Sequence, residues 1–342
     1  MKTKKFDFKD ITIVPEMVSS ISSRKEINIL TSELRLPLMV SPMDTVVDTE
    51  NFFKFSNKGM VVCMPRGESE ISGVFWSISL EEFDLIITNE IILDTCEPVH
   101  ILVDMANGHI KKLHKLCEKF VKQNKKGVHK LMVGNVANPE TYAVLSEIGV
   151  DYVRVGIGGG SGCLTSANTG VHYPMASLIN ECFKIKKINS YRTKIVADGG
   201  FSNYDDIIKA LALGADYVML GGILNKTLES CSQTKLFNLI PINESTAEKI
   251  WYDLPFLRKY MYKNFRGMST KEVQRKWGKS VLTTSEGIVK TNKVEYTLGQ
   301  WVDNFGDYLR SAMSYTNSRN LEDFKNCEIV FITENALKRF NK

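Results

Sequence analysis

The stretch KIVADGGFSNYDDIIKALALGADYVMLGG, residues 194–222, contains a strand–helix–strand pattern. Its two apolar runs, at 194–200 and 216–222, are short and continuous, which is typical of strands covered on both faces. Between them, residues 203–214 carry apolar side chains at helical spacing and end in glycine, a common helix stop. A strand, a helix and a second strand are therefore predicted in that order.

The same alternation extends over most of the chain. Further apolar runs lie at 36–42, 59–65, 74–79, 100–106, 130–135 and 151–157, and residues 138–149 repeat the helical spacing with a terminal glycine. Strands that alternate with helices in this number predict an α/β protein with a (β/α)8 barrel, formed as a single domain by residues 1–342. A doubly wound open sheet is the alternative, because similar strand patterns can also produce it.

Polar residues and glycines at the carboxyl ends of the runs favour the barrel. They are Asp44, Asp104, Asn135, Gly158, Asp198 and Gly221. In a barrel, all strand ends surround one active site, whereas in an open sheet they would have to gather at a single crevice. One such aspartate is often only a helix N-cap, but the repetition indicates a functional site.

Composition limits the partners and the compartment. The net charge of +5 comes from 44 basic and 39 acidic residues mixed along the chain, so no nucleic-acid partner is predicted. No apolar stretch approaches the length of a membrane span, and the first residues lack a signal-peptide core, so we expect a cytoplasmic protein without a membrane partner. The 7 cysteines form no CxxC pairs, which argues against a disulfide framework and against zinc.

Residues 223–300 interrupt the alternation. This stretch is too long and polar for an ordinary connection, so we interpret it as a mobile flap, inserted after the eighth strand as a lid or binding loop. A helical pattern resumes at 298–315, and a short apolar stretch follows at 328–333.

The loop GIGGGSGCLTSANTG, residues 156–170, places Cys163 among glycines. It is a poor dinucleotide fingerprint, because no helix start follows the glycines directly and the next acidic residue is Glu181. A cysteine surrounded by free amides can become a thiolate nucleophile, but the residues alone leave a structural role equally open. Thr165 would bring a hydroxyl to the same face if the loop is extended there.

Glycines also follow the last two predicted strands. The ADGG and LGG ends fit the phosphate site that barrels often form after strands seven and eight. Asp198 would accept hydrogen bonds from a ribose, and the amides of Gly221 and Gly222 would hold phosphate. The alternative is a pair of tight turns without a ligand.

Taken together, the motifs resemble the IMP dehydrogenase and GMP reductase family. In the order of that family, the chain contains SPMDTV (41–46), VDMANGH (103–109), VGNV (133–136), VGIGGGSGCLTSANTGVHYP (155–174), VADGG (196–200), YVMLGG (217–222), RGMS (266–269) and SEG (285–287). The resemblance covers nearly the whole chain. It implies a barrel that binds a purine nucleotide and a nicotinamide cofactor, with Cys163 attacking the purine C2 atom.

Two features favour the reductase branch within this resemblance. No regulatory CBS modules fit between Pro65 and Val103, and no Arg-Tyr pair, which the dehydrogenase uses to activate water, occurs in 266–300. Thr165 and Glu286 match the reductase pair that acts on the departing ammonia. The implied reaction is NADPH-dependent conversion of GMP to IMP through a Cys163 thioimidate. An IMP dehydrogenase-like enzyme, a divergent enzyme for another purine (deoxy)nucleotide and a non-catalytic purine-nucleotide sensor remain alternatives.

The resemblance also implies site residues and an assembly. The nucleotide would be bound by Ser161, Asp198, Gly199, Gly200, Gly221, Gly222, Gly267, Met268, Ser269, Ser285 and Gly287. The cofactor NADPH would be bound by Ser23, Arg24, Arg66, Asp104, Met105, Ala106, Ile157, Gly158, Ser311 and Ser314. Carbonyls of Gly158, Gly160 and Cys163 would hold a potassium ion, and the protein would be a homotetramer.

Several positions depart from the family pattern. Gly159 stands for the usual proline of the loop, Ser166 for an arginine, and Thr283 for an arginine ahead of the SEG motif. The stretch 223–262 is also longer than in typical reductases.

Overall fold

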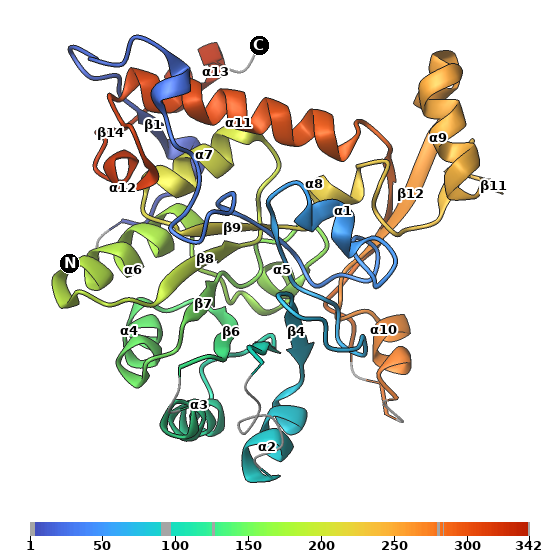
Figure 1. The fold of residues 1–342 in the computed structure, drawn as a ribbon, viewed down its shortest axis with the longest axis horizontal. Helices are drawn as coiled ribbons and strands as arrows, with labels where there is room; N and C mark the ends of the chain where they lie inside the picture. Colours follow the sequence, from blue (N-terminus) through green and yellow to red (C-terminus); the bar gives the residue numbers. More distant parts are fainter. Residues whose placement is uncertain (1–3, 90–96, 125–126, 279–280, 283, 341–342) are drawn as a thin grey trace.

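The computed structural model describes residues 4–89, 97–124, 127–278, 281–282 and 284–340. Its centre is an 8-stranded parallel sheet with helices around it (Figure 1). The strands are β2 (Leu38–Val40), β3 (Val61–Val62), β4 (Phe75–Ile78), β5 (His100–Asp104), β6 (Lys130–Val136), β7 (Tyr152–Val155), β8 (Lys194–Asp198) and β9 (Tyr217–Leu220). They follow the order β3-β2-β9-β8-β7-β6-β5-β4. A parallel bridge from Cys63 to Phe75 joins the two ends of the sheet. The predicted (β/α)8 barrel is confirmed.

Each strand is buried on two sides, which explains the continuous apolar runs. Met39 points into a central cluster, while its neighbours Leu38 and Val40 join the larger core that includes helix residues. The central cluster fills the barrel with side chains from all eight strands or their ends: Met39, Cys63, Phe75, Leu102, Met132, Tyr152, Val196, Tyr217 and Met219. The barrel interior is therefore packed, and a ligand site can form only at its mouth.

The main outer helices are α2 (Leu80–Asn89), α3 (Lys111–Gln123), α4 (Pro139–Ile148), α6 (Met175–Asn189), α7 (Tyr204–Ala212) and α11 (Leu298–Tyr315). Three of them, α4, α7 and α11, lie where the sequence predicted helices, at 138–149, 203–214 and 298–315. Asn138 caps α4 by accepting from two backbone amides, and Gly149 ends it with φ of 98°. Thr297 and Gln300 form a capping box at the start of α11. These local signals explain the agreement at both ends of the helices.

Short elements complete the barrel. They are η1 (Phe8–Asp10), η2 (Arg24–Glu26), α1 (Phe52–Ser56), α5 (Thr165–Thr169), α8 (Gly222–Asn225), α12 (Leu321–Phe324) and α13 (Glu334–Phe340). The apolar stretch predicted near the C-terminus is β14 (Ile329–Phe331), which pairs antiparallel with β1 (Ile11–Ile13). Within the described ranges, no helix has the length and apolar character needed to cross a membrane.

Residues 223–300, the insertion, contain a second sheet that the sequence did not predict. Its strands follow the order β11 (Ile240–Pro241), β10 (Thr234–Leu236), β12 (Met261–Arg266) and β13 (Val289–Lys293). The insertion also contains α9 (Glu244–Asp253), η3 (Pro255–Tyr260) and α10 (Lys271–Lys276). The side chains of β12 alternate between buried and partly buried, but one of the buried ones is Lys263, which hides the apolar period.

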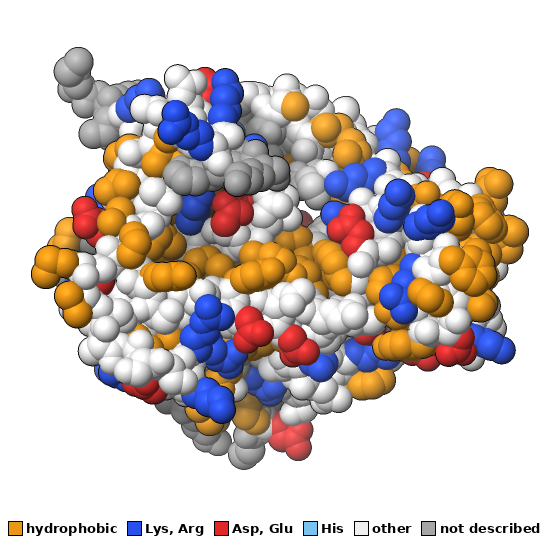
Figure 2. Space-filling model, turned by 90° about the horizontal axis from the view of Figure 1, so that it is seen from above, with side chains coloured by type: hydrophobic (Ala, Val, Ile, Leu, Met, Phe, Trp, Pro, Cys, Tyr) orange, Lys and Arg blue, Asp and Glu red, His pale blue; other side chains and the backbone are white. Residues whose placement is uncertain are grey.

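The insertion has its own apolar core and an apolar outer end. Leu228, Ala247, Ile250, Trp251, Met261 and Val294 form the core. Figure 2 shows apolar side chains gathered at the end of the molecule where α9 and β11 lie, and Leu239 and Ile240 are among the exposed ones. This part of the chain is thus a folded unit and not an open loop.

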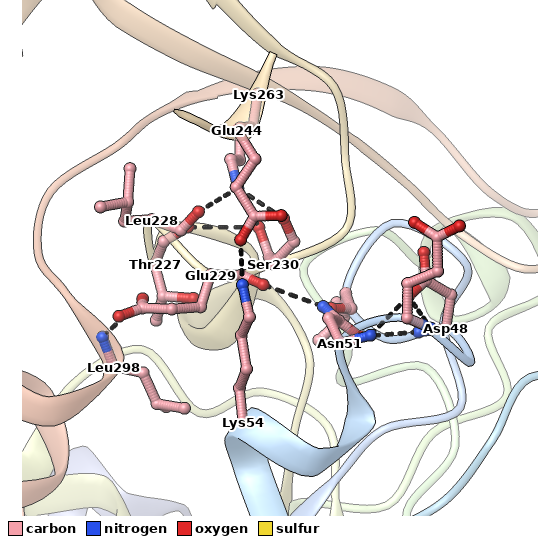
Figure 3. Close-up of polar contacts among 12 residues, drawn as sticks. Asp48, Asn51, Lys54, Thr227, Leu228, Glu229, Ser230, Glu244, Lys263 and Leu298 are labelled. Atoms are coloured by element: carbon pink, nitrogen blue, oxygen red, sulfur yellow. Dashed lines mark hydrogen bonds and ion pairs between the residues drawn. The ribbon is translucent and has the colours of Figure 1, made fainter. Parts of the chain in front are cut away.

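Lys263 is buried at the base of the insertion, with 1% of its surface exposed (Figure 3). Its ammonium group donates to the carbonyls of Leu228 and Ser230, at 2.7 and 2.5 Å, and lies 3.0 Å from the Ser230 hydroxyl. These oxygens replace the water that the charge loses. Burial nevertheless lowers the pKa of Lys263 to about 8.

The low pKa of Lys263 predicts a pH-dependent stability. Its ordinary pKa is 10.5, so between about pH 8 and 10.5 the unfolded chain binds the proton that the folded chain lacks. The free energy of unfolding contributed by this residue should therefore rise with pH over that window, by up to about 3 kcal/mol. Urea unfolding of wild type and Lys263→Met at several pH values measures the difference. A difference that is constant or falls with pH contradicts the expectation.

Candidate active site

The loop after β7 carries Cys163 across the barrel mouth. Gly156 permits a close crossing, since a Cβ there would lie 2.2 Å from the Asp198 carbonyl oxygen, and its φ is +130°. Cys163 itself is half-buried, whereas Cys63, Cys117 and Cys182 are fully buried. Burial raises the pKa of those three thiols far above the usual value. Among these four thiols, Cys163 is the one placed for chemistry.

Cys163, Thr165 and Glu286 come together at this loop. The Cys163 thiol donates to the Thr165 hydroxyl at 3.2 Å, and that hydroxyl donates to the Glu286 carboxylate. The expectation of an extended loop at Thr165 is wrong, because Thr165 is the first residue of α5. The start of the helix turns its side chain back toward the cysteine.

Backbone contacts hold Glu286 at the cysteine loop. Within residues 223–300, which were predicted as a flap, Glu286 belongs to the segment between β12 and β13, residues 267–288. Only this shorter segment is called the flap from here on. The Glu286 carbonyl accepts from the Leu164 amide at 2.6 Å, and the Ile288 amide donates to the Gly162 carbonyl at 3.0 Å. Gly162 has no room for a side chain, because a Cβ would lie 2.8 Å from the Phe265 ring. The flap and the loop are therefore in direct backbone contact.

The predicted nucleotide residues surround the same loop. A Cβ on Gly222 would lie 2.9 Å from the Ser161 hydroxyl oxygen, and one on Gly199 would lie 3.0 Å from the Gly160 amide nitrogen. The remaining members, Gly200, Gly221, Gly267, Met268, Ser269, Ser285 and Gly287, lie at the ends of β8, β9 and β12 or in the flap. The backbone of several glycine-containing segments thus approaches closely around the cysteine loop.

Two strand-end carboxylates share one buried arginine. Arg154 of β7 is 5% exposed, and its guanidinium lies 2.6 Å from Asp104 and 2.8 Å from Asp198. The Asn135 amide also donates to Asp198 at 2.8 Å. Asp198 contributes the same oxygen, Oδ2, to the contacts with Asn135 and Arg154, so neither contact uses Oδ1.

Arg154 is not among the site residues predicted from the sequence. The available signal was a lone arginine in the apolar run 151–157, adjacent in the barrel to strands that end in aspartate. A buried charge needs a partner, so that arginine could have been assigned to the strand-end carboxylates.

Residues 93–341 match the family model described as IMP dehydrogenase / GMP reductase domain. The chain belongs to this family. It is 27% identical to a GMP reductase of Lactobacillus acidophilus over 351 residues, covering 96% of each chain. A GMP reductase of Buchnera aphidicola is 30% identical over 369 residues, covering 98% of this chain and 97% of the relative. One from Onchocerca volvulus is 26% identical and covers 98% and 93%. The family resemblance found in the sequence is confirmed.

In this member of the IMP dehydrogenase/GMP reductase family, the predicted cofactor residues form two groups. Arg66, Asp104, Met105, Ala106, Ile157 and Gly158 lie at or just after the ends of β3, β5 and β7. Ser23, Arg24, Ser311 and Ser314 lie in η2 and at the end of α11, where the Ser314 carbonyl accepts from the Ser19 hydroxyl. Figure 1 shows that end of α11 beside β1 and β14, away from α5 and α10. A single chain therefore does not unite all ten positions.

Two of the three carbonyls predicted for potassium, those of Gly158 and Gly160, already accept hydrogen bonds. The Ser166 hydroxyl donates to Gly158 at 2.9 Å, and the Cys163 amide donates to Gly160 at 2.9 Å. Ser166, which stands in place of the family arginine, thus stabilises the loop by a hydrogen bond within it. Thr283, the other replaced arginine position, lies outside the described residues. In the part of the chain that the structure describes, no group of three or more His, Cys, Asp or Glu side chains could hold a metal ion.

Proposed function

We propose that this protein converts GMP to IMP and ammonia, with NADPH as the electron donor. The Thr165 hydroxyl, which contacts the Cys163 thiol and the Glu286 carboxylate, carries the proposal. Such an arrangement places a proton-transfer pair beside a nucleophile, as the departure of an amine requires. Relatives named GMP reductase that align over nearly the full chain support it.

The residues have distinct roles in the proposed reaction. The Cys163 sulfur attacks the purine C2 atom, and the new carbon–sulfur bond forms as an electron pair moves onto the ring nitrogen. The bond from C2 to the amino nitrogen then breaks, and Thr165 with Glu286 delivers the proton with which ammonia leaves, giving a thioimidate on Cys163. Asp198 orients the ribose, and the glycine amides of the strand ends hold the phosphate.

The barrel mouth fits a nicotinamide cofactor. The Arg66 Nε atom is buried and lies 3.7 Å from Asp104, too far for a hydrogen bond. Its N–H is therefore available to donate to a polar ligand atom. Ile157 and Met105 provide partly buried apolar surface nearby. When bound, the cofactor would supply the hydride that reduces C2. The carbon–sulfur bond then breaks, which releases IMP and restores the Cys163 thiolate. The separation of Ser23, Arg24, Ser311 and Ser314 from this group suits the homotetramer that we also propose.

Two assays with the same protein test the function. We expect loss of NADPH absorbance together with formation of IMP when GMP is supplied. Activity with IMP and NAD instead, or with another purine ribo- or deoxyribonucleotide from a panel, would replace this proposal. Binding without any turnover across the panel would identify a nucleotide sensor.

We propose a potassium ion at the carbonyls of Gly158, Gly160 and Cys163. Each carbonyl oxygen has two lone pairs, and the bonds from Ser166 and the Cys163 amide use one each on Gly158 and Gly160. A bound ion stabilises the folded state by linkage, so the melting temperature should rise with potassium chloride and saturate. Choline chloride at equal ionic strength is the control, and identical melting curves in the two salts would exclude the site.

A further inference from the structure

The flap helix α10 contacts the barrel mouth at two strand ends. The Lys276 ammonium lies 3.4 Å from Asp44, which follows β2 and also pairs with Arg266. At the other contact, the guanidinium of Arg66, after β3, lies over the Trp277 ring, 3.4 Å from its centroid. Trp277 is the residue that ends α10. The helix is thus held by an ion pair on one side and by a stacked cation on the other.

Arg66 of the stacked pair also lies close to the charged residues of the site. Arg66 lies 3.7 Å from Asp104, and Asp104 pairs at 2.6 Å with Arg154, which in turn pairs with Asp198. The Arg66 side chain is 20% exposed and that of Arg154 is 7% exposed, so solvent screens these contacts only in part. Trp277 therefore touches one end of a continuous set of charges that reaches the carboxylate proposed to bind ribose.

The contact between Trp277 and Arg66 and the contact between Glu286 and Thr165 occur in the same conformation of the flap. Trp277 and Glu286 both belong to the flap. In this arrangement the Glu286 carbonyl also accepts from Leu164, and Gly287 forms a bridge with Cys163. The flap is thus docked at two places in one structure, near its middle on Arg66 and near its C-terminal end on the cysteine loop.

We propose that Trp277 is a positioning residue, whose stacking on Arg66 holds the flap where Glu286 reaches the Cys163–Thr165 pair. An indole face binds a guanidinium more strongly than an aliphatic side chain does, because the ring quadrupole attracts the cation. Loss of the ring should reduce the equilibrium constant for docking of the flap about tenfold, the factor expected for one partly buried cation–π contact. The kinetic consequence rests on the proposed function, but the conformational one does not.

Alkylation of Cys163 tests the flap position without any reaction. The docked flap bridges Cys163, so iodoacetamide should modify it slowly in wild type and about tenfold faster in Trp277→Ala. Peptide mass spectrometry reports this site separately from the other cysteines. Trp277→Phe should restore most of the protection, and Val281→Ala, at a flap residue 79% exposed, should alkylate like wild type.

A double-mutant cycle attributes the effect to the pair. In an Arg66→Met background, Trp277→Ala should cause little further acceleration of alkylation, because the stacking partner is already gone. Equal alkylation rates in wild type and Trp277→Ala, or an undiminished effect of Trp277→Ala without Arg66, would overturn the proposal. A global loss of structure in Trp277→Ala would increase alkylation of Cys63 and Cys117 too. Comparing the melting curves of Trp277→Ala and Trp277→Phe also identifies that outcome.

Kinetics then connect the flap to the reaction. With GMP and NADPH, Trp277→Ala should lower kcat, by at most about tenfold, while the KM for GMP stays within about twofold, because Trp277 acts on the proton-transfer pair through the position of the flap. An increase confined to KM, with kcat unchanged, would contradict the positioning role. If no variant turns over GMP while the alkylation cycle still shows coupling, the proposed function fails and the role of Trp277 in the flap stands.

Discussion

The Cys163→Ala variant is expected to bind GMP and to form neither IMP nor a covalent adduct. The nucleotide contacts proposed for Asp198 and the strand-end glycines do not involve the thiol, so affinity should change little. The carbon–sulfur bond cannot form without the sulfur, and kcat should fall by at least about 10⁴-fold, as it does when other enzymes lose their nucleophile. Intact mass after incubation with GMP, together with a binding isotherm, measures both effects.

Two further variants make this test specific. Glu286→Gln keeps the thiol but removes the carboxylate that accepts from Thr165, so kcat should fall about 10²- to 10⁴-fold, while any covalent adduct remains on Cys163. Cys327→Ala changes a half-buried cysteine outside the site and should behave like wild type. Turnover by Cys163→Ala at a rate near wild type would show that this cysteine is not the nucleophile.

Replacing Arg154 with methionine is expected to destabilise the protein by about 3–5 kcal/mol. The change leaves Asp104 and Asp198 as two partly buried carboxylates, 14% and 15% exposed, without their shared cation, and carboxylates with so little solvent are strongly unfavourable when unpaired. Urea unfolding monitored by circular dichroism gives the free energy of unfolding. Nucleotide affinity should also fall, because Asp198 loses the group that orients it.

An exposed arginine provides the matched control. Arg319 pairs with Glu26 at 2.6 Å, but its side chain is 47% exposed, and Arg319→Met should lower the free energy of unfolding by less than about 1 kcal/mol. Combining Arg154→Met with Asp104→Asn and Asp198→Asn should recover part of the lost stability, since the unpaired charges are then removed. Equal effects of Arg154→Met and Arg319→Met would show that burial does not govern the Arg154 contacts.

The sequence predicted the barrel well because its signals are local. The helix at 298–315 has a capping box and an apolar stripe, and the strands have uniform apolar runs that require cover on both faces. The insertion was predicted only as an interruption. Lys263 occupies a buried position of β12, so the alternation of that strand could not be recognised without the carbonyls that receive the ammonium group.

The candidate site also contains residues that the sequence predicted and residues that it did not. Cys163 and Thr165 are close in sequence, and the glycines around them indicated an unusual backbone. The sequence marks Arg154 as a charge in an apolar run that needs an acidic partner, but which two aspartates it contacts depends on how β5, β7 and β8 are ordered and aligned in the barrel. The contact between Arg66 and Trp277 joins positions about two hundred residues apart, and no local pattern marks it.

By itself, the sequence determined the (β/α)8 fold, the family and the residue types available for chemistry, since hydrophobic period, helix caps and motif order are properties of short segments. Only the tertiary structure decided which of those residues meet. It placed Glu286 on Thr165, set Arg154 between two aspartates and stacked Arg66 on Trp277. These contacts depend on strand register and on the docking of the flap, which are set by packing between segments that are distant along the chain.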